Sequence, residues 1–255
     1  MSIFAVAGAT GHVGSVVARE LLAAGHKVRA IVRSIDKAKA LAGQGAELLA
    51  GELGDGRFLT SALRGADGAF LLLPPPPMDS PDVRAFQDRI AHVEATAVAE
   101  SGVRHVVVLS SWGAEQPAGT GPIVGLHVLE EALKKTGAIS TFLRAGSFTE
   151  NLLAMLPAAK HVSQVVYVLG THEYSAVDQA AYLSKKLGKE IKLLTLPVSA
   201  ASGTMQKGGV GQSMAALYQE MYEGATKGLL SVEPGHRVER GTLTLEAALD
   251  PYFSA

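Results

Sequence analysis

A glycine-rich segment near the start of the chain has the spacing of a phosphate-binding loop. Gly8, Gly11 and Gly14 stand directly after an apolar run and at the start of an amphipathic helical pattern. The first permits a tight turn, the second leaves room for a pyrophosphate at the backbone, and the third lets the helix pack closely on a strand. Free amides at the helix start then hold the phosphates. The alternative is a glycine-rich turn without a cofactor. The predicted phosphate-binding residues are Gly8, Thr10, Gly11, His12, Val13 and Gly14.

The end of the second apolar run, Lys27–Val32, is basic where a site for NAD would be acidic. Arg33 follows the run directly, Ser34 stands beside it, and Lys37 comes one helical turn later. An acidic residue there would bind the ribose 2′-hydroxyl, whereas a cation can bind a 2′-phosphate. We therefore expect NADP(H) to be preferred over NAD(H). A strand-end arginine that is simply solvated is the alternative.

Further candidate residues follow the ends of the other apolar runs. The carboxyl ends of parallel strands meet at one edge of a sheet, and ligands bind in the crevice outside that edge. Surface loops and strand ends without a ligand would give the same pattern. The residues expected to border the adenine, the ribose and the nicotinamide are Glu52, Leu53, Leu72, Leu73, Pro74, Ser110, Gly146, Ser147 and Phe148.

Two residues are candidates for acid–base chemistry. His127 stands at the start of a helical pattern, and histidine titrates near neutral pH, so it could supply a proton. A purely structural hydrogen bond is its alternative role. The hydroxyl of Ser111, at the end of the fifth apolar run, could polarise an acceptor oxygen, or it could cap the strand end. Trp112 could wall a flat acceptor or pack in the core. The histidines show no metal-ligand spacing, so we expect no metal.

Short apolar runs separated by helical patterns must position these residues. The order strand, helix, strand implies a parallel sheet covered on both faces. We therefore predict an α/β fold, a Rossmann-type doubly wound parallel sheet over residues 1–155, with a small C-terminal lobe over 156–255 packed as part of the same domain. The predicted strands are Ile3–Ala7, Lys27–Val32, Glu47–Ala50, Ala69–Leu73, His105–Ser110 and Ser140–Leu143, and the helices between them include Val13–Ala24, Ala85–Ser101 and Leu126–Lys135.

The lobe has a less regular pattern. Val165–Leu169 predicts a further strand, and Met214–Glu223 has helical periodicity. Between them, Ser199–Ser213 is rich in Gly, Ser and Ala and predicts a mobile surface loop. Val177–Leu187 predicts a helix that turns four side chains inward. Those four side chains are Ala180, Ala181, Leu183 and Leu187.

Composition limits the possible functions. The 255 residues carry a formal net charge of −1, which gives no overall attraction for nucleic acid or an anionic membrane. The absence of cysteine excludes disulfides, thiolate nucleophiles and Fe–S clusters. The apolar runs are far shorter than a membrane span. We expect a cytoplasmic protein whose partner is a small-molecule acceptor, and which could be a homodimer.

The chain resembles the NmrA-like group of atypical short-chain dehydrogenases/reductases. That group includes NADPH-dependent quinone and azo-dye reductases as well as redox-sensing regulators. The resemblance implies an NADPH-dependent reductase of a quinone-like, azo or other conjugated molecule, or alternatively an NAD(P)-binding regulatory protein without turnover; an epimerase or isomerase is a third possibility. The segments that carry it are the glycine loop, Val28–Arg33, Val106–Ser111, Gly121–Ile123, His127, Glu130–Leu133, Thr141–Phe148, Glu150–Leu153, Met221–Gly224 and Arg240–Glu246.

The chain departs from its relatives in two places. The stretch that matches the superfamily's Tyr-x-x-x-Lys motif, Pro122–Leu126, has neither residue, and we interpret the Tyr182 to Lys186 spacing as a coincidence. Tyrosine–lysine proton transfer is therefore not expected. Relatives also carry a few dozen more residues where Lys160 joins His161 here. This junction reflects either a deletion that opens the cleft or an omitted segment, and we favour the second.

Overall fold

The computed structural model describes most of the chain. The described residues are 1–77, 79–146, 164–169, 175–188, 190, 196–242, 244 and 246–247. The predicted junction of Lys160 with His161 lies outside them. Among the described residues, no helix is both long and apolar enough to cross a lipid bilayer.

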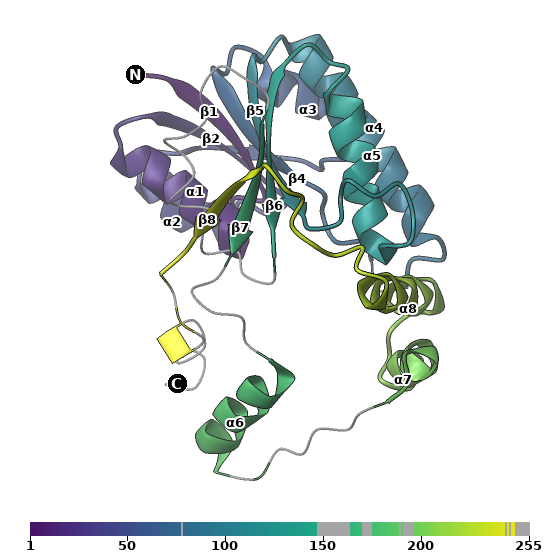
Figure 1. Cartoon of the computed structure of the whole chain (residues 1–255). Helices are drawn as coiled ribbons and strands as arrows, with labels where there is room; N and C mark the ends of the chain where they lie inside the picture. Colours follow the sequence, from purple (N-terminus) through teal and green to yellow (C-terminus); the bar gives the residue numbers. More distant parts are fainter. Residues whose placement is uncertain are drawn as a thin grey trace.

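The described strands form one parallel eight-stranded sheet of order β3-β2-β1-β4-β5-β6-β7-β8 (Figure 1). Its first six strands have the order 3-2-1-4-5-6, which confirms the predicted Rossmann-type fold. All seven predicted strands are present within one or two residues, whereas β8 was not predicted. The strands are β1 (Ile3–Ala7), β2 (Lys27–Val32), β3 (Glu47–Ala50), β4 (Gly68–Leu72), β5 (His105–Ser111), β6 (Ile139–Ala145), β7 (Gln164–Leu169) and β8 (Arg237–Arg240).

Helices cover both faces of the sheet (Figure 1). On one face α1 (His12–Ala23) and the short α2 (Lys39–Gly43) enclose a core that includes Val17 and Phe70. The larger core, on the other face, includes Phe142 and lies beneath three helices. The central strands β1, β2, β4 and β6 are buried from both sides, so their apolar residues run nearly continuously along the sequence, whereas the edge strand β8 is largely exposed. The three helices on that second face are α3 (Gly56–Leu63), α4 (Val83–Ser101) and α5 (Val124–Leu133).

The segment predicted as a mobile loop, Ser199–Ser213, is mostly helical, so that prediction is wrong. A 3-10 turn, Val198–Ala200, leads into α7 (Ala201–Lys207), and α8 (Gln212–Thr226) begins soon after. The seven residues of α7 are too few for a stable isolated helix. Packing of α7 against α8 supplies the missing stability, and composition does not reveal that contact.

α8 is attached to the core by close backbone contacts and polar bonds. A Cβ added at Gly121 would lie 2.0 Å from the Leu217 carbonyl oxygen, so glycine is required where the loop after β5 meets α8. Glu220 accepts a hydrogen bond of 2.8 Å from the Gly119 amide and pairs with Arg84 at the start of α4. The C-terminal helix is therefore held against the β5–α5 connection.

The predicted lobe helix is present as α6 (Ala176–Leu187), but part of its predicted inward face is wrong. Leu187 is 46% exposed, and Ala181 is also exposed, whereas Tyr182 is buried. Lys186 is exposed, as predicted, so the residues of the apparent Tyr-x-x-x-Lys spacing have opposite environments. Ala180 is buried and Leu183 is half-buried, as predicted, so the buried face of α6 is narrower than predicted and includes Tyr182.

Candidate functional site

The glycine loop has the backbone geometry that its spacing predicts. Gly8 has a φ of +60°, which side chains rarely adopt, and its carbonyl accepts a hydrogen bond of 2.8 Å from the Gly11 amide. A Cβ at Gly14 would lie 2.3 Å from that same carbonyl oxygen. The loop therefore turns within one residue of β1, and α1 begins at close range.

The amino end of α1 has no side-chain cap. The capping position of α1 is Gly11, whereas Asp55, Asp82 and Ser175 cap α3, α4 and α6 with side-chain oxygens. Because the first turn of any helix has amides without partners inside the helix, those of α1 remain available to an anion. Thr10, Gly11 and His12 are exposed, so a phosphate can approach them.

The loop lies at the point where the strand order reverses. β1 pairs with β2 on one side and with β4 on the other, which is where ligands bind in open α/β sheets. A Cβ at Gly8 would lie 2.9 Å from the Leu72 side chain, so the loop contacts the end of β4. Leu72, Leu73 and Pro74 are half-buried there. Of these three predicted residues, Leu72 contacts the glycine loop, and Leu73 and Pro74 follow it directly in the chain.

The end of β2 presents two cations. Arg33 and Lys37 are exposed, and neither has a hydrogen bond or ion pair within the described ranges. The nearby acid Asp36 is paired instead with Lys39 at 2.8 Å. Ser34 is half-buried beside Arg33. The two side chains are available to an anionic group beside the glycine loop.

The next strand end lies beside this pair. The amide of Gly51 donates to the Val32 carbonyl at 3.0 Å, which holds the end of β3 against the end of β2. Glu52 is exposed and Leu53 is half-buried at this edge. Gly146 is half-buried directly after β6, whereas Ser147 and Phe148 lie outside the described residues.

The two serines at the end of β5 point to opposite faces. Ser110 is 4% exposed and its hydroxyl donates to Oε1 of Glu130 at 2.6 Å. Ser111 lies on the other face, half-buried, and in the described part of the molecule its hydroxyl has no partner. Strand alternation causes this split. Ser110 thus has a structural bond, and Ser111 keeps a hydroxyl for a ligand.

A buried ion pair holds Glu130, and the sequence analysis did not single it out. Arg144 on β6 donates from Nε to Oε1 at 3.0 Å and from Nη2 to Oε2 at 2.7 Å, a bidentate arrangement. Nη1 of Arg144 also donates to Glu115 at 3.0 Å and to Glu233 at 2.5 Å. The only sequence signal was an arginine inside an otherwise apolar strand.

His127 makes one hydrogen bond with a defined direction. Its Nδ1 lies 2.9 Å from the carbonyl oxygen of Ala114. A carbonyl oxygen can only accept, so Nδ1 carries the proton and, in the neutral ring, Nε2 has the lone pair. No partner of Nε2 occurs in the residues that the structure describes. His127 therefore makes the structural bond that was its alternative role, and its second nitrogen remains available.

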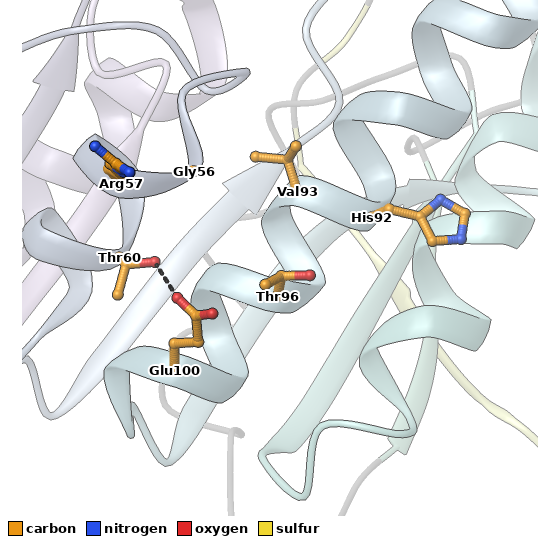
Figure 2. Close-up of a pocket in the computed structure, with 7 residues that line it drawn as sticks. All are labelled: Gly56, Arg57, Thr60, His92, Val93, Thr96 and Glu100. Carbon is orange, nitrogen blue, oxygen red and sulfur yellow. Dashed lines mark hydrogen bonds between the residues drawn. The ribbon is translucent and has the colours of Figure 1, made fainter.

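A hollow between α3 and α4 lies outside this site (Figure 2). It has a volume of about 340 Å³ and none of the predicted residues lines it. Thr60 and Glu100 point toward each other across it and share a hydrogen bond of 3.3 Å. The lining residues are Gly56, Arg57, Thr60, His92, Val93, Thr96 and Glu100.

Fold and loop together define a class of protein. A 3-2-1-4-5-6 parallel sheet with an uncapped glycine loop at its switch point is the architecture of dinucleotide-binding Rossmann proteins. Within that class, the chain belongs to the NmrA-like family, which its residues 2–169 match.

Several relatives of the chain are named as reductases. The chain is 27% identical over 253 residues to the NAD(P)H azoreductase of Xenophilus azovorans, with 85% of each chain covered. It is 27% identical over 266 residues to quinone oxidoreductase 2 of Escherichia coli (strain K12), with 89% of each covered. The crystal structure of an NADPH-dependent quinone oxidoreductase from Escherichia coli, complexed with NADPH, has a TM-score of 0.74 at 25% identity and covers 98% of this chain and 100% of that chain.

Proposed function

We propose that this protein is an NADPH-dependent reductase of a quinone-like, azo or other conjugated small molecule. The proposal is carried by the start of α1 at the glycine loop, which has no side-chain cap, and by Arg33 and Lys37 beside it, which have no partner among the described residues. The family relatives named as NAD(P)H azoreductase and quinone oxidoreductase support it. When bound, NADPH supplies the hydride, and the protein supplies binding, orientation and a proton.

The phosphates would be held by the first amides of α1 together with the glycine loop. Arg33 and Lys37 would bind the 2′-phosphate, with Ser34 beside them. Leu72 would wall the ribose, because it lies against the loop at the end of β4, and Leu73 and Pro74 would continue this wall. Glu52 and Leu53 would border the adenine, and Gly146 would approach the nicotinamide end.

His127 and Ser111 are the proposed acid–base pair. With Nδ1 held by a carbonyl, only Nε2 of His127 can exchange a proton with an acceptor: the imidazolium would donate its Nε2 proton and become the neutral Nδ1–H ring. The Ser111 hydroxyl would hydrogen-bond the acceptor oxygen or nitrogen. Ser110 is assigned no hydroxyl role, since Glu130 holds it on the opposite face.

The first test combines turnover with cofactor affinity. Purified protein with NADPH is expected to reduce members of a panel of quinones and azo dyes faster than the uncatalysed reaction. Arg33→Ala should weaken NADPH binding about 10- to 100-fold, because a hydrogen bond to a charged group contributes about 1.5–3 kcal/mol, while NADH binding barely changes. Arg57→Ala, an exposed arginine on α3, is the control and should change neither.

Equal losses for NADPH and NADH in Arg33→Ala would refute the 2′-phosphate assignment. Tight NADPH binding without oxidation of the cofactor by any acceptor would favour the regulatory protein over the reductase. If His127→Ala leaves the pH–rate profile unchanged, His127 is not the proton donor.

A further inference from the structure

Arg144 bonds to both α5, which carries His127, and the loop after β5, whose carbonyl accepts a hydrogen bond from the His127 ring. The imidazole belongs to α5, and the carbonyl that receives its proton belongs to Ala114 in the loop after β5. Arg144 binds Glu130 on α5 and Glu115 in that loop, one residue beyond Ala114. We propose that Arg144 is a positioning residue that fixes the orientation and tautomer of His127.

The helix side of this arrangement is rigid. Glu130 lies three residues after His127, so the two side chains are within one turn of α5. Glu130 is 1% exposed and Arg144 is 2% exposed, and two parallel hydrogen bonds join them. Ser110 adds a third bond to the same carboxylate. This part of α5 therefore cannot shift along β5 and β6 without breaking buried charged bonds.

On the loop side, one charged hydrogen bond joins Arg144 to the loop after β5. Nη1 of Arg144 and Glu115 are 3.0 Å apart, and the Glu115 side chain is 12% exposed. The loop is also tied at its start, where the Trp112 amide donates to the Ala145 carbonyl at 3.2 Å. Between these two ties lies Ala114, fully buried, with its carbonyl toward His127. Loss of the Glu115 bond removes the tie to β6 next to Ala114, and the nearest remaining tie on that side is the bond of the Gly119 amide to Glu220.

The third acid on Arg144 provides a matched comparison. Glu233 binds the same nitrogen, Nη1, at 2.5 Å, but it belongs to the segment before β8, and its other ion-pair partner in the described structure is His236, which is in neither α5 nor the Ala114 loop. Removing Glu115 or Glu233 takes one carboxylate from the same guanidinium nitrogen. If Arg144 positions His127 as described, only the first removal disturbs the imidazole.

The inference rests on the proposed function only for the role of His127 as proton donor. The orientation and tautomer of the His127 ring can be measured without turnover. The test uses the full-length protein with ¹⁵N-labelled histidine, and His127→Ala assigns the His127 signals among the eight histidines. Wild-type His127 is expected in the Nδ1–H form. Glu115→Ala should move the tautomer ratio toward Nε2–H by up to about fivefold, the change in an equilibrium constant that one net hydrogen bond represents.

Glu233→Ala should leave the His127 signals as in the wild type. Glu115→Gln, whose amide oxygen can still accept from Nη1, should restore most of the Nδ1–H form. An unchanged tautomer in Glu115→Ala, or equal changes in both alanine variants, overturns the proposal. Should Glu115→Ala fail to fold, the comparison of Glu115→Leu with Glu233→Leu decides in the same way, because leucine keeps most of the side-chain volume but cannot accept from Nη1.

Turnover gives a second, separate measurement. Glu115→Ala should lower kcat with an acceptor several-fold while the Kd for NADPH stays within about twofold, because the phosphate loop is not involved. A wild-type protein without any reductase activity refutes the proposed function but leaves the tautomer result intact. A normal kcat in Glu115→Ala alongside a changed tautomer would support the positioning role of Arg144 and refute the role of His127 as proton donor.

Discussion

Two glutamates on neighbouring helices are buried to the same degree and have opposite surroundings. Glu130 on α5 is 1% exposed and Glu94 on α4 is 0% exposed. Glu130 accepts hydrogen bonds from Arg144 and Ser110, whereas neither carboxylate oxygen of Glu94 has a partner in the described structure. Desolvation by burial raises the pKa of the Glu94 carboxyl well above its ordinary value of 4.5.

The difference separates two uses of a buried carboxylate. Around Glu130, charged bonds connect a strand, a helix and two loops at the carboxyl edge, where the proposed site lies. Around Glu94, the buried residues of the same helix are mainly apolar, and a carboxyl there remains protonated over a wider pH range. Glu130 therefore stabilises a particular arrangement of the site, while Glu94 reduces stability at neutral pH.

The largest effect is expected at the paired glutamate. Glu130→Ala leaves the buried Arg144 guanidinium without its bidentate partner, so we expect a loss of about 3–5 kcal/mol in the free energy of unfolding. Urea denaturation followed by circular dichroism measures it. The double variant Glu130→Leu with Arg144→Met should recover part of this loss, because the buried guanidinium is removed together with its bidentate carboxylate, while Glu115 and Glu233 lose their cation. A cost below about 1 kcal/mol in Glu130→Ala would contradict the importance of the pair.

An effect of opposite sign is expected at the unpaired glutamate. Glu94→Leu removes a buried polar group without a partner and should stabilise the protein by about 1–3 kcal/mol at neutral pH. The folded-state pKa of Glu94 is raised, so its contribution to the free energy of unfolding of the wild type is fully present below pH 4.5. This contribution is lost as the pH rises toward the folded-state pKa. The difference between Glu94→Leu and the wild type should therefore be larger at pH 8 than at pH 5.

The control for this series is Glu100→Gln, on the same helix but exposed, which should show no such growth with pH. Urea denaturation of the three proteins at both pH values gives the comparison. If the advantage of Glu94→Leu shrinks from pH 5 to pH 8, the carboxyl is ionised in the folded state, and the contrast with Glu130 disappears.

The smallest effect is expected at a glutamate on the surface. Glu131, next to Glu130 on α5, is hydrogen-bonded to Lys134 at 2.6 Å, and both side chains are 44% exposed. That hydrogen bond, ahead of the charges nearby, lowers the pKa of Glu131, so its contribution is present above pH 4.5 and is lost as pH falls below it. Glu131→Gln should cost less than about 0.5 kcal/mol by thermal unfolding. If Glu131→Gln lowered the free energy of unfolding as much as Glu130→Ala, burial would not determine how much each glutamate contributes to stability.

Local sequence patterns were sufficient to predict the fold and the backbone turn of the glycine loop. Buried parallel strands are continuous apolar runs, so the first seven strands could be predicted to within one or two residues. The spacing of Gly8, Gly11 and Gly14 predicted a turn that the φ of Gly8 and the contact at Gly14 confirm. Prediction failed where packing between elements determines the structure. The segment of α7 was predicted as a loop, and Ala181 and Leu187 of α6 were predicted to face inward but are exposed.

The candidate site divides in the same way. Ser110 and Ser111 are identical in type and adjacent in sequence, and both were predicted to serve the site. Only the pairing of β5 with β6 and α5 shows that one hydroxyl is used by Glu130 and the other is not. Nor could the chain order reveal that Arg144 and Glu233, 89 residues apart, share a hydrogen bond.

By itself the sequence determined the Rossmann topology, the glycine turn and the basic end of β2, because these depend on backbone conformation and on residues close together in the chain. Only the tertiary structure decided which serine bonds Glu130, which nitrogen of His127 is engaged and which buried glutamate binds a cation. Those properties are set by contacts between residues distant in sequence, where a few tenths of a nanometre separate a charged hydrogen bond from an unpaired, desolvated carboxyl.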